Sequence, residues 1–193
     1  MATQHKRGPF DEVDTWLPKD YPWLLEPSPR ELPVPLGPRA HTAAELEATV
    51  PEGVYTDKAG DPVDVGRAVV EHLLAKPERW NGREQYFPLI PHVIENPQEM
   101  WVTFIRYRWS GRFALRRKYF GLYEIEGGPP RAFGVVVDTI DGRLVAFSAF
   151  DGKIGGRLRT GRLAWPNRND PSPPRRSSHS GSVGGGPDPV GMP

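Results

Sequence analysis

The apolar residues of this chain follow two different periods, and the change between them falls near residue 98. Before that point they recur every three or four positions, which is typical of amphipathic helices. Thr42 and Glu45 have the spacing of a capping box, and Asp64 resembles the cap of a second helix. The pattern predicts three helices, over residues 42–48, 64–76 and 87–96.

After residue 98 the apolar residues alternate with polar ones, as they do in half-buried β-strands. The run Val135–Val137 is continuous and indicates a strand covered on both faces. Asp141-Gly142 predicts a tight hairpin turn, because both central positions of that turn need positive φ. The expected strands are 100–109, 112–126, 132–139 and 143–150. Helices followed by an antiparallel meander make an α+β fold, with two or three helices packed on a four-stranded sheet.

Composition divides the 193 residues into three parts. Residues 1–40 are rich in Pro and also carry large apolar side chains such as Trp16, Tyr21 and Trp23, so we expect an extended arm that docks on the domain or on a partner. Residues 166–193 hold seven Pro, five Gly and five Ser, and we expect a disordered tail. The folded domain is then 41–165. With no Cys and no apolar run long enough to span a bilayer, the chain is expected to be soluble, without disulfides and without a membrane partner.

The net charge of +1 conceals an asymmetry along the chain. Residues 1–100 have a net charge of −7, residues 101–165 a net charge of +7, and the tail a net charge of +1. A segment with this excess of positive charge is typical of a surface that binds a polyanion such as RNA. The alternative is that the basic half neutralises the acidic half within one fold.

The expected strand 112–126 carries a row of cations on one of its sides. Alternation places Arg112, Arg116 and Lys118 on that side, and places Tyr119 on the other. A sheet with helices on one face leaves the row in water, where guanidinium groups can bind phosphate while a base stacks on a neighbouring ring. The competing interpretation is an edge strand protected from aggregation by its charges.

The sequence has no metal motif, and candidates for acid–base chemistry are few. Asp61 and Asp64 have no His partner at ligand spacing, so we expect neither a metal nor another cofactor. Three histidines lie in the expected domain: His41, His72 and His92. An imidazole can exchange protons near neutral pH, but His72 falls on the apolar stripe of its helix, where a buried structural histidine is the commoner outcome.

Six short segments resemble, in their order and spacing, the phage-associated nuclease-like domains of the barnase, EndoU, colicin and RelE superfamily. The segments are Gly82–Ile90, Ile94–Trp101, Arg116–Tyr119, Val135–Val137, Ala146–Phe150 and Arg159–Leu163. The resemblance covers about residues 65–165. It implies a helical front half followed by a four-stranded antiparallel sheet. It also implies a metal-free ribonuclease in which a 2′-hydroxyl attacks the adjacent phosphate.

Site residues follow from the resemblance position by position. Its polar motif positions correspond to Arg83, Arg116, Tyr119 and Ser148, with His72 as a candidate acid or base. We expect the nucleic acid to contact Arg112, Lys118, Phe150 and Arg162. Strand alternation separates Arg116 from Tyr119, so either a β-bulge near Arg117 brings them together or one of the two is structural.

Two functions of different classes are compatible with the sequence. The first is a phage- or toxin-type RNA-cleaving domain, with RNA as substrate and an immunity protein as a partner. The second is a non-catalytic virion component or adaptor that docks on phage structural proteins through residues 1–40. The expected location is accordingly the host cytoplasm or the virion.

Overall fold

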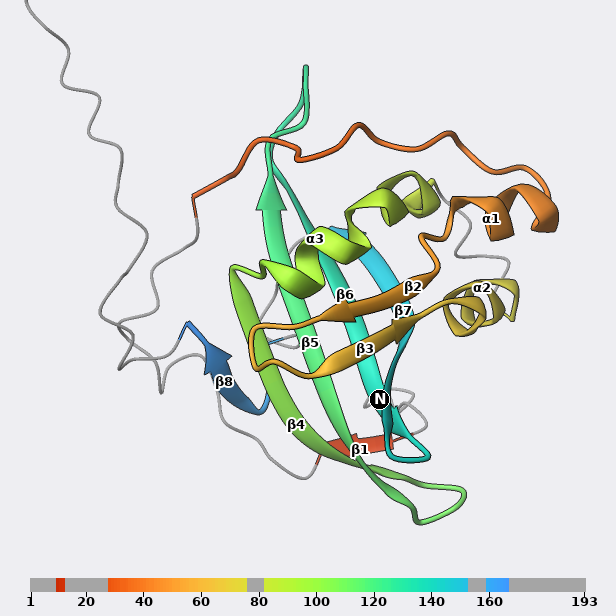
Figure 1. Cartoon of the computed structure of the whole chain (residues 1–193), viewed down its shortest axis with the longest axis vertical. Coiled ribbons are helices and arrows are strands. Elements are labelled where there is room, and N and C mark those ends of the chain that lie inside the picture. The colour runs from red at the N-terminus through yellow and green to blue at the C-terminus, as the bar shows by residue number, and fades with distance from the viewer. Residues whose placement is uncertain (1–9, 13–27, 76–81, 153–158, 167–193) are drawn as a thin grey trace, which may run out of the picture.

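The computed structural model describes residues 10–12, 28–75, 82–152 and 159–166 (Figure 1). The helices are α1 (Ala43–Thr49), α2 (Arg67–Leu74), the 3₁₀ helix η3 (Arg83–Leu89) and α3 (Ile90–Glu95). The strands are β1 (Phe10–Glu12), β2 (Gly53–Thr56), β3 (Pro62–Val65), β4 (Glu99–Tyr107), β5 (Phe113–Tyr123), β6 (Arg131–Ile140), β7 (Arg143–Gly152) and β8 (Arg162–Trp165). No helix in these ranges is long and apolar enough to cross a membrane.

All of these strands belong to one mixed sheet. Its order is β1-β4-β5-β6-β7-β3-β2, and β8 pairs with β4 beside β1. β3 runs parallel to β7, and the other pairs are antiparallel. The sheet curls, so that the β2–β3 hairpin passes across the face of the central strands together with α3 (Figure 1). The curl encloses the hydrophobic core between the two ends of the sheet.

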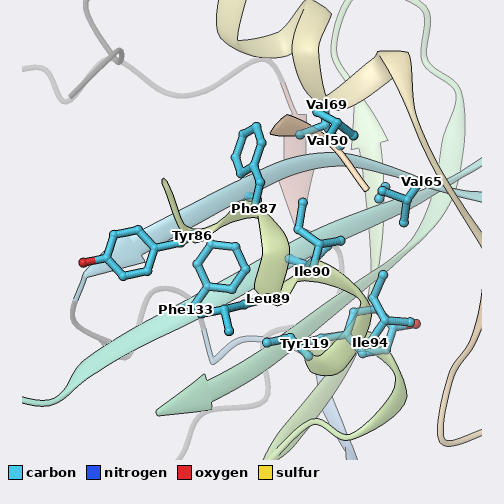
Figure 2. Close-up of a cluster of buried hydrophobic side chains, with 14 of the residues drawn as sticks. Val50, Val65, Val69, Tyr86, Phe87, Leu89, Ile90, Ile94, Tyr119 and Phe133 are labelled. Carbon is cyan, nitrogen blue, oxygen red and sulfur yellow. The ribbon is translucent and has the colours of Figure 1, made fainter. Parts of the chain in front are cut away.

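The core lies between α2, η3 and α3 and one face of the central strands β4–β7, which we call the inner face. Leu89, Ile90 and Ile94 are fully buried and lie next to Tyr119 and Phe133 of the sheet (Figure 2). The opposite side of β4–β7 is the outer face. Because side chains alternate along a strand, neighbours of the core residues point to the outer face.

The structure confirms the α+β class and corrects two of its details. The expected four-stranded sheet is too small, since β1, β2, β3 and β8 also join it. Asp64 caps no helix, because residues 62–65 form β3 and α2 begins only after Gly66. Val63 and Val65 are buried, and Pro62 occupies the first strand position, where its missing N–H is tolerated. The Asp141-Gly142 turn is confirmed, with φ of 49° and 78°.

Of the expected arm 1–40, the structure describes residues 10–12 and 28–40. Arg30 forms a bridge with Tyr123, and its guanidinium donates to the carbonyl of Asn96 at 2.8 Å. Leu32, Val34 and Leu36 pack against the core. The remainder of the arm, and the expected disordered tail beyond Pro166, lie outside the described residues.

Candidate active site on the outer face of the sheet

Cross-strand register brings polar residues from four strands together on the outer face. Thr103 of β4 lies opposite Arg116 of β5, which in turn lies opposite Asp138 of β6. In the adjacent row, Lys118 lies opposite Val136, which lies opposite Ser148 of β7. A group of polar side chains therefore lies on the side of the sheet that faces away from the core.

Arg116 and Asp138 form a two-pronged ion pair at the centre of this face. Arg116 Nε is 2.7 Å from Asp138 Oδ1, and Nη2 is 2.9 Å from Oδ2. The hydroxyl of Tyr107 also donates to Oδ2. Arg116 and Asp138 are only 4% and 1% exposed. Such a paired fork fixes the plane and position of the guanidinium far better than a single surface contact would.

Burial raises the pKa of Tyr107, and the neighbouring Asp138 carboxylate raises it further. The sign follows from charge, because a buried phenolate beside a carboxylate is less stable than the neutral phenol. Tyr107 is therefore a hydrogen-bond donor at neutral pH and cannot serve there as a base.

A β-bulge connects this ion pair with α2. The β6–β7 register shifts between Val136 and Val137, which leaves Phe147 as the extra residue of β7. The ring centroid of Phe147 lies 5.0 Å from Arg116 Cζ and 5.5 Å from the centroid of the His72 ring. His72 and Arg116 thus contact the same aromatic ring, although 44 positions separate them in the sequence.

The segment that leads into β8 covers the other end of the outer face. Arg159 makes two hydrogen bonds to the buried carboxylate of Glu99, which also accepts from the indole N–H of Trp101. Lys118 Nζ donates to the hydroxyl of Thr160. The expectation that Arg116 and Lys118 stand in water is therefore wrong, since each is only 4% exposed.

Gly161 allows the segment before β8 to lie close against the outer face. Its φ is +91°, and a Cβ built on it would lie 2.3 Å from the carbonyl oxygen of Val102 and 2.6 Å from Cβ of Thr103. No other residue type fits at that separation with that backbone conformation. The chain can cross β4 closely only because residue 161 lacks a side chain.

Tyr119 lies on the inner face, away from Arg116. Its hydroxyl donates to Asp57 Oδ2 at 2.7 Å, and its ring lies among the core side chains (Figure 2). Arg117 extends in the same direction and contacts Asp57 and Asp61 of the β2–β3 turn. The register of β5 with its two neighbours has no shift at Arg117, so no bulge brings Tyr119 and Arg116 together.

The inner network makes stability depend on pH. Burial alone would raise the pKa of Asp57, but hydrogen bonds from Tyr119, from the Asp61 backbone N–H and from Arg117 lower it overall. A carboxyl whose pKa is lowered by folding stabilises the folded protein above its ordinary pKa of about 3.9, and this contribution disappears as the pH falls through the lowered value.

We therefore expect Asp57→Asn to lower the free energy of unfolding by about 2 kcal/mol at pH 7, because charged hydrogen bonds to a buried group are lost. Urea unfolding between pH 7 and pH 2 measures the effect. The difference from the unsubstituted protein should shrink toward the acid end of the series. Glu52→Gln, at an exposed carboxylate, is the control and should leave the profile unchanged. A difference that persists undiminished at pH 2 contradicts the interpretation.

The other residues expected from the sequence lie apart from the Arg116–Asp138 ion pair, and Arg83 is on η3, whose buried side chains pack into the core of the inner face. Ser148 and Phe150 lie on it in β7, and Phe150 contacts Phe120 edge-on with 6.0 Å between ring centroids. Arg112 immediately precedes β5, with its Cζ 5.4 Å from the ring centroid of Tyr107. Arg83 is half-buried at the start of η3, and Arg162 is exposed on β8.

Sequence reasoning missed several residues of this site: Glu99, Tyr107, Asp138, Phe147 and Arg159. One feature of the sequence points to Asp138: it is the only carboxylate of β6, directly follows the apolar run Val135–Val137, and lies between two strands that carry cations. No feature of the sequence points to Phe147, because its contact with Arg116 depends on the β-bulge, and the bulge is not visible in the alternation of β7.

A buried arginine is fixed on a basic sheet face, and an imidazole contacts the same aromatic ring as its guanidinium. This arrangement is suited to phosphate chemistry, and with the α+β fold it defines a nuclease-like class. Residues 40–166 match the family model described as phage-Barnase-EndoU-ColicinE5/D-RelE like nuclease 2, and the chain belongs to this family. No curated protein and no solved structure matches the chain.

Proposed function

We propose that this domain cleaves RNA without a metal ion, by attack of a 2′-hydroxyl on the adjacent phosphate. The observation that carries the proposal is that the buried Asp138 holds the buried Arg116 against Phe147, whose ring also contacts the half-buried His72. Membership of a nuclease-like family supports the same class of reaction.

Arg116 would stabilise the charge that develops on the phosphate oxygens in the transition state. A guanidinium already fixed by Asp138 needs no reorganisation at the moment of reaction, which is the main source of electrostatic catalysis. The half-buried Ser148 lies in the neighbouring row of the same face and would contact the phosphate or the ribose, whereas Lys118 is covered by Thr160 and is assigned no contact.

His72 would move the proton. The proton of the 2′-hydroxyl goes to the imidazole, the bond between the 2′-oxygen and phosphorus forms, and the bond from phosphorus to the 5′-oxygen breaks. The leaving 5′-oxygen takes its proton from the imidazolium or from solvent. Tyr119 takes no part in this proposal, because its hydroxyl donates to Asp57 on the inner face. Arg83 remains a predicted site residue to which the proposal assigns no step.

Purified protein incubated with RNA in the presence of EDTA tests the proposal. We expect fragments that end in a 2′,3′-cyclic phosphate, and a cleavage rate that falls at acid pH because the base becomes protonated. His72→Gln should remove that acid limb along with most of the rate. RNA that stays intact at micromolar protein contradicts the proposal and favours the non-catalytic adaptor.

A further inference from the structure

The end of the β4–β5 hairpin carries six exposed side chains of two kinds, aromatic and basic. We call this group the hairpin tip, and it consists of Phe104, Arg106, Arg108, Trp109, Arg112 and Phe113. Trp109 is 92% exposed, and Phe104 and Phe113 are 53% and 60% exposed. The hairpin projects beyond the part of the sheet that the helices cover (Figure 1).

Exposed aromatic side chains at this density mark a binding surface. Burying one large apolar side chain is worth about 1.5–3 kcal/mol, so a domain that leaves three of them in water forgoes a substantial stabilisation. Clustered exposure of this sort is typical of interaction sites, whereas single exposed apolar residues need no explanation.

The charge of the hairpin identifies the occupant. From Met100 to Tyr123 the chain has no acidic residue and has six basic ones, of which the tip holds three, Arg106, Arg108 and Arg112. The other three contact groups elsewhere in the fold, and Asp11 of β1 lies opposite Arg106 in the strand register, so the tip's candidates for binding phosphate are Arg108 and Arg112. Arginines interleaved with exposed rings are the pattern by which proteins bind single-stranded nucleic acid, with bases stacked on the rings and phosphates held by the cations. An uncharged or basic protein partner fits less well, because it would offer no phosphate or carboxylate to the exposed Arg112.

The side of the hairpin tip that carries Arg112 is continuous with the candidate active site, whereas Phe104, Arg106 and Phe113 point to the opposite side of the hairpin, the side of Tyr119. Arg112 lies against the ring of Tyr107, and Tyr107 donates to Asp138, which holds Arg116. Arg112 and Arg116 are four residues apart on the chain, a separation of about 14 Å along an extended strand. A strand of RNA that leaves the site along β5 therefore arrives at the tip.

We propose that the hairpin tip binds the single-stranded RNA that flanks the cleaved phosphate, with a base stacked on Trp109 and phosphates held by Arg108 and Arg112. This inference rests on the proposed function, since it assigns to the tip the substrate of that same site. It adds that the enzyme reads several nucleotides and prefers unpaired RNA to a duplex, because only unpaired bases can stack on a protein ring.

Binding can be measured separately from cleavage with a fluorescein-labelled, fully 2′-O-methylated 20-nucleotide single strand, which has no 2′-hydroxyl to attack. Fluorescence anisotropy should show that Trp109→Ala weakens binding about 5- to 150-fold, the range found when a stacking ring is removed. Arg108→Gln and Arg112→Gln should each reduce the slope of log K against log[salt] by about 1. Arg143→Gln, at an exposed arginine of β7, is the matched control and should change affinity less than twofold.

Cleavage rates for a long and a short substrate distinguish binding at the hairpin tip from the chemical step at the active site. Trp109→Ala should slow cleavage of a 20-nucleotide RNA at subsaturating concentration by the same factor, and should leave cleavage of a dinucleotide unchanged. Unchanged affinity for the 20-nucleotide strand in all three tip variants overturns the inference, whether or not RNA is cleaved. Loss of affinity without any RNA cleavage by the unsubstituted protein upholds binding at the tip and overturns the proposed reaction alone.

Discussion

Asp138→Ala is expected to lower the free energy of unfolding by about 3–5 kcal/mol. The substitution leaves the Arg116 guanidinium buried without its counter-charge, and removing one partner of a buried ion pair is among the most destabilising single changes. It also removes the acceptor of the Tyr107 hydroxyl. Urea unfolding at pH 7 measures the change.

A surface pair in the same sheet supplies the control. Asp151 pairs with Arg131 at 2.9 Å, and the side chain of Arg131 is 51% exposed. Asp151→Ala should therefore cost no more than about 1 kcal/mol. Equal losses for the two substitutions would mean that the Arg116–Asp138 pair is not buried in the way described.

The double substitution Arg116→Met with Asp138→Leu is expected to fold and to lose RNA cleavage by a factor of about 10² to 10³. Replacing a buried ion pair with apolar groups of similar volume is often neutral or stabilising, so the double variant should recover the stability that Asp138→Ala loses. The loss of rate corresponds to removing one group that stabilises charge in the transition state.

Circular dichroism and urea unfolding establish that the double variant is folded, and single-turnover cleavage of a short RNA measures its rate. Arg131→Ala removes an exposed cation elsewhere on the sheet and is expected to keep the unsubstituted rate within about threefold. A folded double variant with full activity would remove Arg116 from the proposed mechanism.

The central strands could be predicted from the sequence because their signal is local. Alternation from residue 100 onward indicates strands near β4 to β7, and it correctly separates Arg116 from Tyr119 onto opposite faces. β3 could not be found in this way, because its pairing partner β7 lies about 80 positions away and Asp64 has a residue type equally typical of a helix cap.

The burial of the site could not be predicted for a similar reason. On a strand considered alone, Arg116 would be exposed to water. In the folded protein it is buried, because Asp138 and Phe147 from two other strands contact it. Lys118 is covered by Thr160, which follows more than 40 positions later and approaches closely only because Gly161 has no side chain. Contacts between residues so far apart in the sequence do not alter the local hydrophobic periodicity, so the periodicity cannot predict them.

The central claim concerns the 2′-hydroxyl, and one substrate tests it directly. A labelled 20-nucleotide DNA strand with a single ribonucleotide at its centre, incubated with the protein and EDTA, should be cut only on the 3′ side of that ribonucleotide. The 5′ fragment should end in a 2′,3′-cyclic phosphate, and the all-deoxy strand should remain intact. Cleavage of the all-deoxy strand, or of the ribonucleotide-containing strand at other positions, would contradict the mechanism.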